Sequence, residues 1–528
     1  MKRKLLPILA VCALIVALWS CSKELKVQLV QSRELKAELE GQVKDLPEIS
    51  GIETCGFGIR FDKEYYWVDA GGSITVNYEM SSPGSVAVVA GDGWSSTVTQ
   101  AQDDKGSIFV SAPDPAAPII LTVSAGDVSG HTIERFVQVF VRKPYNMSAV
   151  PRIETMGYNG FSDELATEEN FRKLAESGIT IITVEGDWEP WIDWRKQCRL
   201  AGKYGIKVVL FINGTAGDYS ADPDNYKGLD QKVLEAETYP AVCAYQIADE
   251  PSTVQARTLA IAKSRIEQLA PNHPVYINLH PASVSQLGMG AATYADYVEH
   301  FASVCDLKFI TFDQYPVFKW GVEDSWFTAL DVVSSTARRH GIPFWAFLLC
   351  SREPGRVDPD LCNIRLQGNV DLMYGAQCIQ FFVWKAHSAT DYAPIMNDGE
   401  YKPVYYDCKE YNRELHNREF VFAGGNVWKV RHTGLESYKH GTALTQDDYP
   451  EAISDMSIAG DALISFVGNH GNEYVAVCNK SWQDKLPVEL TFTRTVYSID
   501  RNGGFTEQHP GTSAFEIDEG DMLIVKWR

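Results

Sequence analysis

The segment AYQIADEPS, Ala244–Ser252, places two adjacent carboxylates directly after a run of mainly apolar residues. Other short apolar segments in the middle of the chain are followed in the same way by acidic, amide and aromatic side chains. They are Glu154 and Asn159, Glu185 and Asp187, Asn213, Asn278 and His280, Asp313 and Tyr315, Ser351 to Glu353, and Trp384 to His387. Two carboxyl groups that meet at one place can divide acid and base work between them. These residue types therefore favour carboxylate chemistry.

Patterns typical of other catalytic classes are missing from the sequence. The 11 histidines form no HxH or HExxH pair, and the 11 cysteines show no CxxC or zinc-type spacing. There is no GxSxG elbow and no glycine-rich phosphate loop. We therefore expect no metal and no cofactor. The 48 basic and 69 acidic residues give a net charge of -21, which disfavours binding to nucleic acid.

The apolar segments that precede these side chains recur as strand-like units separated by amphipathic, helix-like stretches. They begin near Arg152, Ile179, Lys207, Val242, Pro274, Leu307, Pro343 and Gln377, roughly 27 to 36 residues apart. Eight such units predict a (β/α)8 barrel, and the missing glycine-rich loop disfavours a doubly wound sheet. Because the carboxyl ends of barrel strands meet at one face, the polar side chains should gather there.

The barrel is expected over residues 150–423, with an antiparallel β-sandwich domain on each side of it in the sequence. Residues 51–145 contain short alternating segments separated by Gly, Pro and Ser, as in an immunoglobulin-like sandwich. Residues 424–528 return to the same pattern and predict a second sandwich. The expected fold class is thus α/β, a TIM barrel flanked by two β-sandwiches.

The N-terminus has the pattern of an export signal. Three basic residues precede an apolar run from Leu5 to Trp19, which is short for a membrane span, so residues 1–20 are predicted to be a signal peptide. The residues LWSC, ending at Cys21, resemble the lipobox of bacterial lipoproteins. This resemblance implies lipidation of Cys21 and anchoring in the cell envelope, at the outer membrane of a Gram-negative bacterium, on its periplasmic or its surface face. A plain secreted protein is the alternative. Residues 21–50 would then form a helical or a flexible stalk.

The residues ADEP, at the end of the fourth predicted strand, resemble the Asn-Glu-Pro signature of clan A glycoside hydrolases. The resemblance implies that Glu250 is the general acid. In that clan a Tyr on the sixth strand lies near the nucleophile and a Trp ends the eighth strand as a sugar platform. FDQYP offers Tyr315 and FFVW offers Trp384 at similar places. The implied function is hydrolysis of extracellular oligo- or polysaccharide by a pair of carboxylates.

Two positions depart from the clan A pattern. Asp249 stands where the clan has an Asn that contacts a sugar hydroxyl. The seventh predicted strand ends in Leu348 and Leu349, where the clan has its nucleophilic Glu. The candidates for the second carboxylate are Asp313, Glu353 and Glu185. The apolar end of this strand also leaves open a different function, that of a lipoprotein that binds glycans on a degenerate glycosidase barrel.

A carbohydrate is the expected partner, besides the membrane reached through the lipid anchor. The predicted sugar contacts are Asp249, Tyr315, Trp384, Asn278, His280, Asn213, Glu185 and Trp188. Trp188, Trp191 and Trp194 recur at every third position, which is also typical of a helix packing face. Of the three, only Trp188 lies close to a strand end.

Overall fold

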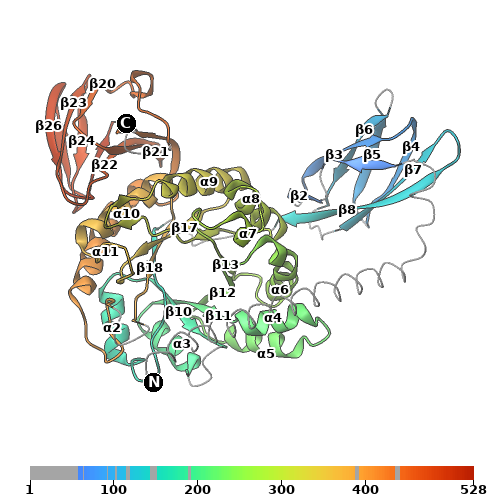
Figure 1. Ribbon diagram of the computed structural model, residues 1–528, viewed down its shortest axis with the longest axis horizontal. Coiled ribbons are helices and arrows are strands. Elements are labelled where there is room, and N and C mark those ends of the chain that lie inside the picture. The colour runs from blue at the N-terminus through green and yellow to red at the C-terminus, as the bar shows by residue number, and fades with distance from the viewer. Residues whose placement is uncertain are drawn as a thin grey trace, which may run out of the picture. The chain divides into compact units, whose positions relative to one another are not determined.

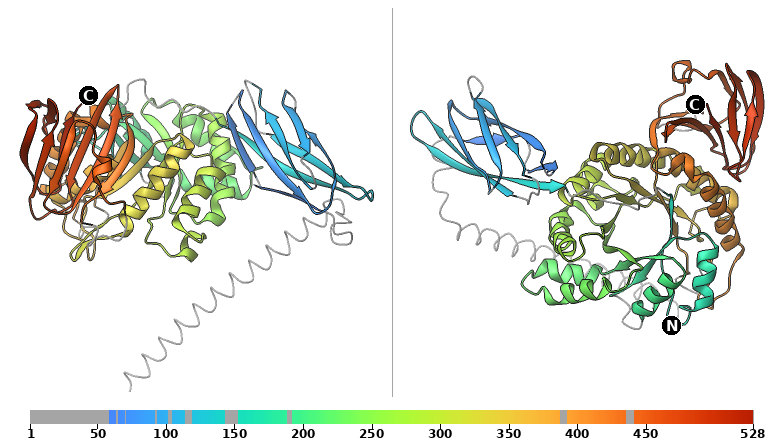
Figure 2. Two further views of the ribbon diagram at one scale, coloured as in Figure 1. Left: turned by 90° about the horizontal axis from the view of Figure 1, so that it is seen from above. Right: turned by 180° about the vertical axis from the view of Figure 1, so that it is seen from behind.

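The computed structural model describes residues 58–527, apart from residues 63–64, 70, 92, 101–103, 114–118, 143–151, 188–191, 387–391 and 435–440. The predicted signal peptide, Cys21 and the predicted stalk lie outside the described residues. The chain divides into two compact units, Met1–Lys143 and Pro144–Arg528. Figures 1 and 2 show the sheets of the first unit and the barrel of the second.

The first unit contains two four-stranded sheets. One has the order β1 (Ile59–Phe61), β3 (Ser73–Met80), β6 (Lys105–Ser111) and β5 (Ser95–Gln100); the other has β2 (Tyr65–Asp69), β8 (Thr132–Arg142), β7 (Ile119–Asp127) and β4 (Gly84–Val89). The pairs are antiparallel except β2 with β8, which is parallel. Burial of Val76, Ile108, Leu121 and Val137 in one core gives the predicted β architecture.

The second unit is built on a closed barrel of eight parallel strands, which confirms the predicted barrel. The strands are β9 (Glu154–Gly157), β10 (Ile181–Glu185), β11 (Lys207–Phe211), β12 (Val242–Asp249), β13 (Val275–Leu279), β14 (Ile310–Phe312), β17 (Phe344–Leu349) and β18 (Cys378–Phe382). β18 pairs with β9 and closes the ring. Because the strands are covered on both faces, β13 and β17 are buried along their whole length.

Helices surround the barrel, as Figure 1 shows. They are α2 (Glu168–Glu176), α3 (Trp194–Lys203), α4 (Asn213–Ala221), α5 (Lys227–Ala236), α6 (Ala256–Leu269), α7 (Gln286–Met289), α8 (Tyr294–Val304), α9 (Ser325–His340), α10 (Leu361–Tyr374) and α11 (Pro403–Phe422). Local sequence sets several helix ends: the side chain of Thr167 accepts a hydrogen bond from the Asn170 amide at the start of α2, and α9 ends at Gly341 with a left-handed φ of 64°. No described helix is both long and apolar enough to cross a lipid bilayer.

Residues after α11 form two antiparallel sheets, as the sequence predicted. The first has the order β19 (Asn426–His432), β21 (Ala462–Asn469), β22 (Asn472–Asn479), β27 (Met522–Lys526), β24 (Val496–Ile499) and β25 (Phe505–Gln508). The second has β20 (Ile453–Ile458), β23 (Leu486–Phe492) and β26 (Gly511–Ile517). Leu463, Val467 and Ala476 of the first sheet belong to the same hydrophobic cluster as the barrel helices.

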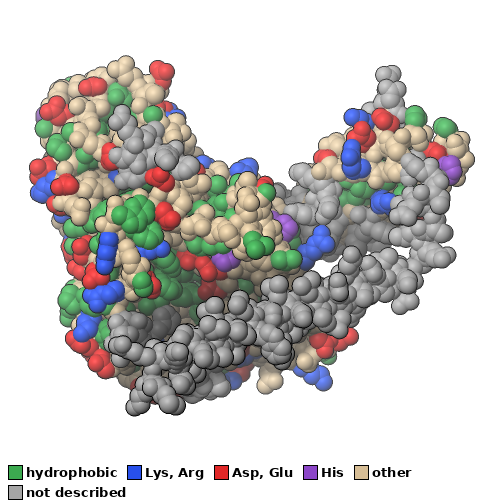
Figure 3. Space-filling model, in the orientation of Figure 1, with side chains coloured by type: hydrophobic (Ala, Val, Ile, Leu, Met, Phe, Trp, Pro, Cys, Tyr) green, Lys and Arg blue, Asp and Glu red, His purple; other side chains and the backbone are tan. Residues whose placement is uncertain are grey.

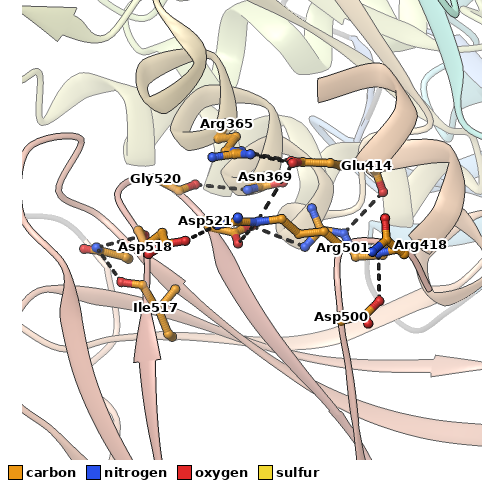
Figure 4. Close-up of polar contacts among 12 residues, drawn as sticks. Arg365, Asn369, Glu414, Arg418, Asp500, Arg501, Ile517, Asp518, Gly520 and Asp521 are labelled. Carbon is orange, nitrogen blue, oxygen red and sulfur yellow. Dashed lines mark hydrogen bonds and ion pairs between the residues drawn. The ribbon is translucent and has the colours of Figure 1, made fainter. Parts of the chain in front are cut away.

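A buried ionic cluster joins the barrel helices to this first sheet (Figure 4). Nε of Arg365, on α10, donates to Glu414 of α11 at 2.9 Å. Nε of Arg501 lies 3.9 Å from the Glu414 carboxylate and donates to Asp521 at 2.6 Å. Arg418 also donates to Asp521, at 3.3 Å. Because Glu414 and Arg418 are almost completely buried, their charges are balanced by protein groups and not by water.

Replacing Glu414 by Ala should therefore destabilise the second unit strongly. The change leaves Arg365 and Arg501 short of a buried counter-charge, a loss that typically costs about 3–5 kcal/mol. Thermal unfolding followed by circular dichroism measures the effect. Glu410→Ala is the matched control, because the Glu410 side chain on the same helix is 42% exposed and pairs with Arg413 at the surface, so its loss should change the midpoint little. Equal midpoints for Glu414→Ala and Glu410→Ala would contradict a structural role for the cluster.

Candidate active site

Glu250 follows β12 in an unusual backbone conformation. Its φ is +47°, in the left-handed region that costs a non-glycine residue about 1–2 kcal/mol. The turn is fixed because the Glu250 amide donates to the Asn278 carbonyl at 2.9 Å and a capping box of Ser252 and Gln255 follows at once. Successive residues of a regular strand point to opposite faces. The turn instead lets the neighbouring side chains of Asp249 and Glu250 reach the same cluster at the barrel mouth.

Asn278 connects two carboxyl groups of this cluster. Its side-chain amide donates to Asp249 at 3.0 Å and to Asp313 at 3.4 Å. Asp249 also accepts a hydrogen bond from the Tyr158 hydroxyl at 3.4 Å. Burial raises the pKa of Asp249, the hydrogen bond from Asn278 opposes that shift, and the charge of Glu250 adds to it. Asn278, itself a predicted site residue, thus holds Asp249 and Asp313, two carboxylates that the sequence predicted at strand ends.

Asp313 lies directly after β14, and its carboxyl group hydrogen-bonds to Glu250. Burial raises the pKa of Asp313 well above its ordinary value, and the negative charges of Glu250 and Asp249 raise it further. Asp313 therefore keeps its proton to higher pH than an ordinary aspartate and donates it in the hydrogen bond to Glu250.

In the space-filling view, acidic side chains lie beside hydrophobic ones over the middle of the barrel (Figure 3).

The hydrogen bond also sets the separation of the two carboxyl groups. Glycosidases with a carboxylate pair separate the two groups by about 5–5.5 Å when they retain configuration and by about 6.5–9.5 Å when they invert it. Hydrogen-bonded carboxyl groups are closer together than either range. Asp313 accordingly donates its retained proton to Glu250 across a separation shorter than that of a hydrolytic carboxylate pair.

His280 flanks Glu250 on its other side. Its Nδ1 lies 3.5 Å from Oε1 of Glu250. The His280 amide donates to the Tyr297 hydroxyl at 3.1 Å, and that hydroxyl donates to the Pro251 carbonyl at 2.8 Å. Tyr297 of α8 thereby holds the loops after β12 and β13 together. No sequence pattern indicates Tyr297, because the residue lies on a helix outside the strand-end pattern.

The two aromatic residues taken from the clan A resemblance lie in different surroundings. The Tyr315 ring packs on Phe382, with centroids 5.1 Å apart, and burial together with the charge of Asp313 raises the pKa of Tyr315 well above its ordinary value. Trp384 is only 1% exposed, and its ring meets Phe381 and Tyr405. The expectation of a sugar platform at Trp384 is therefore corrected: the helix packing around β18 leaves this ring no open face.

The remaining predicted site residues do not belong to the hydrogen-bonded group of Asp249, Glu250, Asn278 and Asp313. Glu353 is half-buried in the loop after β17, where its charge acts on Arg356. Glu185 is half-buried at the end of β10, and Asn213 begins α4 just after β11. Trp188 lies outside the described residues. β17 ends in Leu348 and Leu349, both buried, so this strand end offers no carboxylate.

A polar network inside the barrel supports Asn278 from below. Gln380 on β18 accepts from Tyr276 at 2.8 Å and donates to Thr311 at 2.9 Å, and the Thr311 hydroxyl lies 3.3 Å from the Asn278 amide oxygen. Gln246 on β12 donates to the Tyr158 hydroxyl at 3.2 Å. In the sequence, this network is marked only by single polar residues within otherwise apolar strand segments. Among the residues that the structure describes, no group of three or more His, Cys, Asp or Glu side chains is placed to hold a metal ion.

Comparisons with known proteins find likeness at the level of solved structures. No family model and no curated protein matches the chain. A family 39 glycoside hydrolase from Bacteroides cellulosilyticus WH2 is 10% identical, with a TM-score of 0.45 over 89% of this chain and 100% of that one. A putative glycoside hydrolase from Bacteroides vulgatus is 10% identical (TM-score 0.39; 88% and 99% covered), and a GH5 xyloglucanase from Bacteroides ovatus is 11% identical (TM-score 0.33; 67% and 100% covered). At these values the likeness assigns no role to any residue.

Asp313→Asn should increase stability at alkaline pH. A carboxyl group whose pKa is raised by folding contributes its full stability below its unfolded pKa, near 3.8, and loses it as the pH rises above that value. Asn does not ionise and still offers a donor to Glu250. We expect the melting temperature of Asp313→Asn to exceed that of the wild type by at least ~2 °C at pH 8, with a smaller difference at pH 4. Exposed Asp224→Asn is the control, and a difference independent of pH would contradict the raised pKa.

Proposed function

We propose that this protein is a glycoside hydrolase that acts on extracellular oligo- or polysaccharide, with Glu250 as its general acid. The observation that carries the proposal is the arrangement around Glu250. Its side chain is 41% exposed at the C-terminal end of a barrel strand, while it hydrogen-bonds to Asp313 and lies beside His280. A substrate can therefore reach a carboxyl group that accepts a hydrogen bond from its half-buried neighbour, Asp313.

Breaking a glycosidic bond requires a proton on the leaving oxygen. Asp313 holds its proton to higher pH than an ordinary aspartate, because burial and the negative charges of Glu250 and Asp249 raise its pKa. In the proposed reaction Glu250 gives this proton to the leaving oxygen. The hydrogen bond from Asn278 orients Asp313, and His280 limits the positions that the Glu250 carboxylate can take.

The second group of the reaction must attack the anomeric carbon or activate a water. Glu353 and Glu185 remain the candidates among the predicted carboxylates. Asp313, the third predicted candidate, is closer to Glu250 than either separation range and keeps its own proton. Asp249 is the predicted contact to a sugar hydroxyl. Since β17 ends in leucine, substrates that carry their own nucleophile, such as 2-acetamido sugars, belong in the first panel of compounds.

Glu250→Gln should abolish hydrolysis while leaving binding intact. Gln keeps the shape of the side chain but cannot supply a proton, and loss of a general acid costs about 10²–10⁴ in kcat. The purified full-length protein would be assayed on aryl glycosides, including 2-acetamido glycosides, and on plant and host polysaccharides. Glu451→Gln, an exposed acid of the C-terminal sheets, is the control. Wild-type rates in Glu250→Gln would remove this residue from the mechanism.

A second function is favoured by the buried Leu348 and Leu349 at the place of the clan A nucleophile. The barrel would then bind glycans without cleaving them. In the same assay, this function predicts that wild type and Glu250→Gln bind the same glycan equally and that neither hydrolyses it.

We further propose that the chain is a lipoprotein of the cell envelope, anchored through Cys21 at the outer membrane of a Gram-negative bacterium. The support is the LWSC motif after a basic and apolar leader. Cys21→Ser should move the protein from the membrane fraction to the soluble fraction of an expressing bacterium. Cys12→Ser, within the same leader, should leave it in the membranes, and unchanged fractionation of Cys21→Ser would contradict the anchor.

A further inference from the structure

A small β-hairpin stands on the loop that follows Asp313 and Tyr315. Its strands are β15 (Val317–Phe318) and β16 (Gly321–Val322), so that Lys319 and Trp320 form the turn between them. The hairpin belongs to the connection between β14 and α9, at the same end of the barrel as the carboxyl cluster.

The loop after β17 holds this hairpin in place. The Lys319 amide donates to the Gly355 carbonyl at 3.2 Å, and the Val357 amide donates to the Val317 carbonyl at 3.1 Å. Phe318 and Arg356 form an antiparallel bridge between these two hydrogen bonds. Loops from two neighbouring barrel strands thus pair as one small sheet, and the turn that carries Trp320 has a fixed base.

Rings and a guanidinium group form a continuous stack from the carboxyl cluster to the surface. Tyr315, beside Asp313, lies 5.9 Å from the guanidinium carbon of Arg356, which is 3.9 Å from the Phe318 ring. The Phe318 and Trp320 rings are 5.0 Å apart and nearly parallel, at 18°. Trp320 is nevertheless 70% exposed, so its ring keeps much of its surface open to solvent.

We propose that Trp320 is a platform for a sugar ring of the bound glycan, at a position more than one sugar residue away from the bond beside Glu250. The substrate is accordingly a glycan chain and not a single-sugar glycoside. This inference rests on the proposed function and specifies its substrate class.

Three physical features favour a sugar as the occupant. A large flat ring that is already ordered loses little entropy on binding, which makes it an efficient contact surface. The stack links Trp320 through Phe318, Arg356 and Tyr315 to Asp313, so the exposed ring and the carboxyl cluster are positioned by the same loop. A protein partner is disfavoured because Trp320 and the exposed Lys319 make a much smaller patch than the ~800 Å² per partner of a stable interface.

The test compares substrates of different length. On oligosaccharides of the glycan that the wild type cleaves, Trp320→Ala should raise KM about tenfold for long chains with kcat unchanged, and it should leave the kinetics on a short aryl glycoside unchanged. Trp320→Phe should restore most of the affinity. Trp428→Ala is the matched control, because Trp428 is a 44% exposed tryptophan on β19 of the C-terminal sheets. Equal KM values for Trp320→Ala and wild type at every chain length would overturn the proposal.

A binding measurement separates this proposal from the proposed function. The proteins are run in native gels that contain one polysaccharide of the panel. The platform is supported if the polysaccharide retards the wild type and Glu250→Gln but not Trp320→Ala, even if nothing is hydrolysed. Hydrolysis of long chains that is insensitive to Trp320→Ala overturns the platform and leaves the hydrolase. If no polysaccharide is cleaved or retards the wild type, both are overturned.

Discussion

Electrostatic repulsion among three carboxyl groups is the constraint on which the barrel mouth depends. Asp249, Glu250 and Asp313 come from two strands, and a full negative charge on each would be unfavourable in a partly buried place. The structure reduces this cost by keeping a proton on Asp313 and by giving Asp249 the amide of Asn278 and the hydroxyl of Tyr158. The same protonation that keeps the folded barrel stable is what makes acid chemistry at Glu250 reasonable.

Residues around the carboxyl cluster hold the three carboxyl groups in their arrangement. The network of Tyr276, Thr311 and Gln380 fixes Asn278 from inside, and Tyr297 fixes the loops on either side of Glu250 and His280 from outside. The side chains of Tyr276, Thr311, Gln380 and Tyr297 have their hydrogen bonds arranged before a ligand arrives, which is the condition for a preorganised site. The left-handed backbone at Glu250 is tolerated because these contacts stabilise the turn.

The sequence predicted most of the fold because the strands have a regular pattern. Expected strand starts at Lys207 and Val242 coincide with β11 and β12, and Asp249, Asn278 and Asp313 lie at the carboxyl ends of their strands. Asp249, Glu250, Asn278 and Asp313 were found for that reason. Glu154 is a correction: it begins β9 and pairs with Lys207 at the start of β11, so it lies at the opposite end of the barrel. The burial of Trp384 was not predictable from the strand pattern, because it depends on packing against Tyr405 of α11. Tyr158 was missed within the first strand-end segment, and the Trp320 hairpin was missed because its base is a pairing between two loops.

The ionic cluster of Figure 4 bears on how the second unit can be divided. The sequence pattern changes near residue 424, yet Asn369 of α10 and Glu414 and Arg418 of α11 contact residues that follow α11. A chain ended after α11 would expose Leu415, Val421 and Phe422 together with the charges of Glu414 and Arg418. The C-terminal sheets therefore pack against the barrel helices and cover part of their apolar surface. Genetic exchange of the barrel between proteins would have to include the C-terminal sheets, whereas the first unit has a separate hydrophobic core.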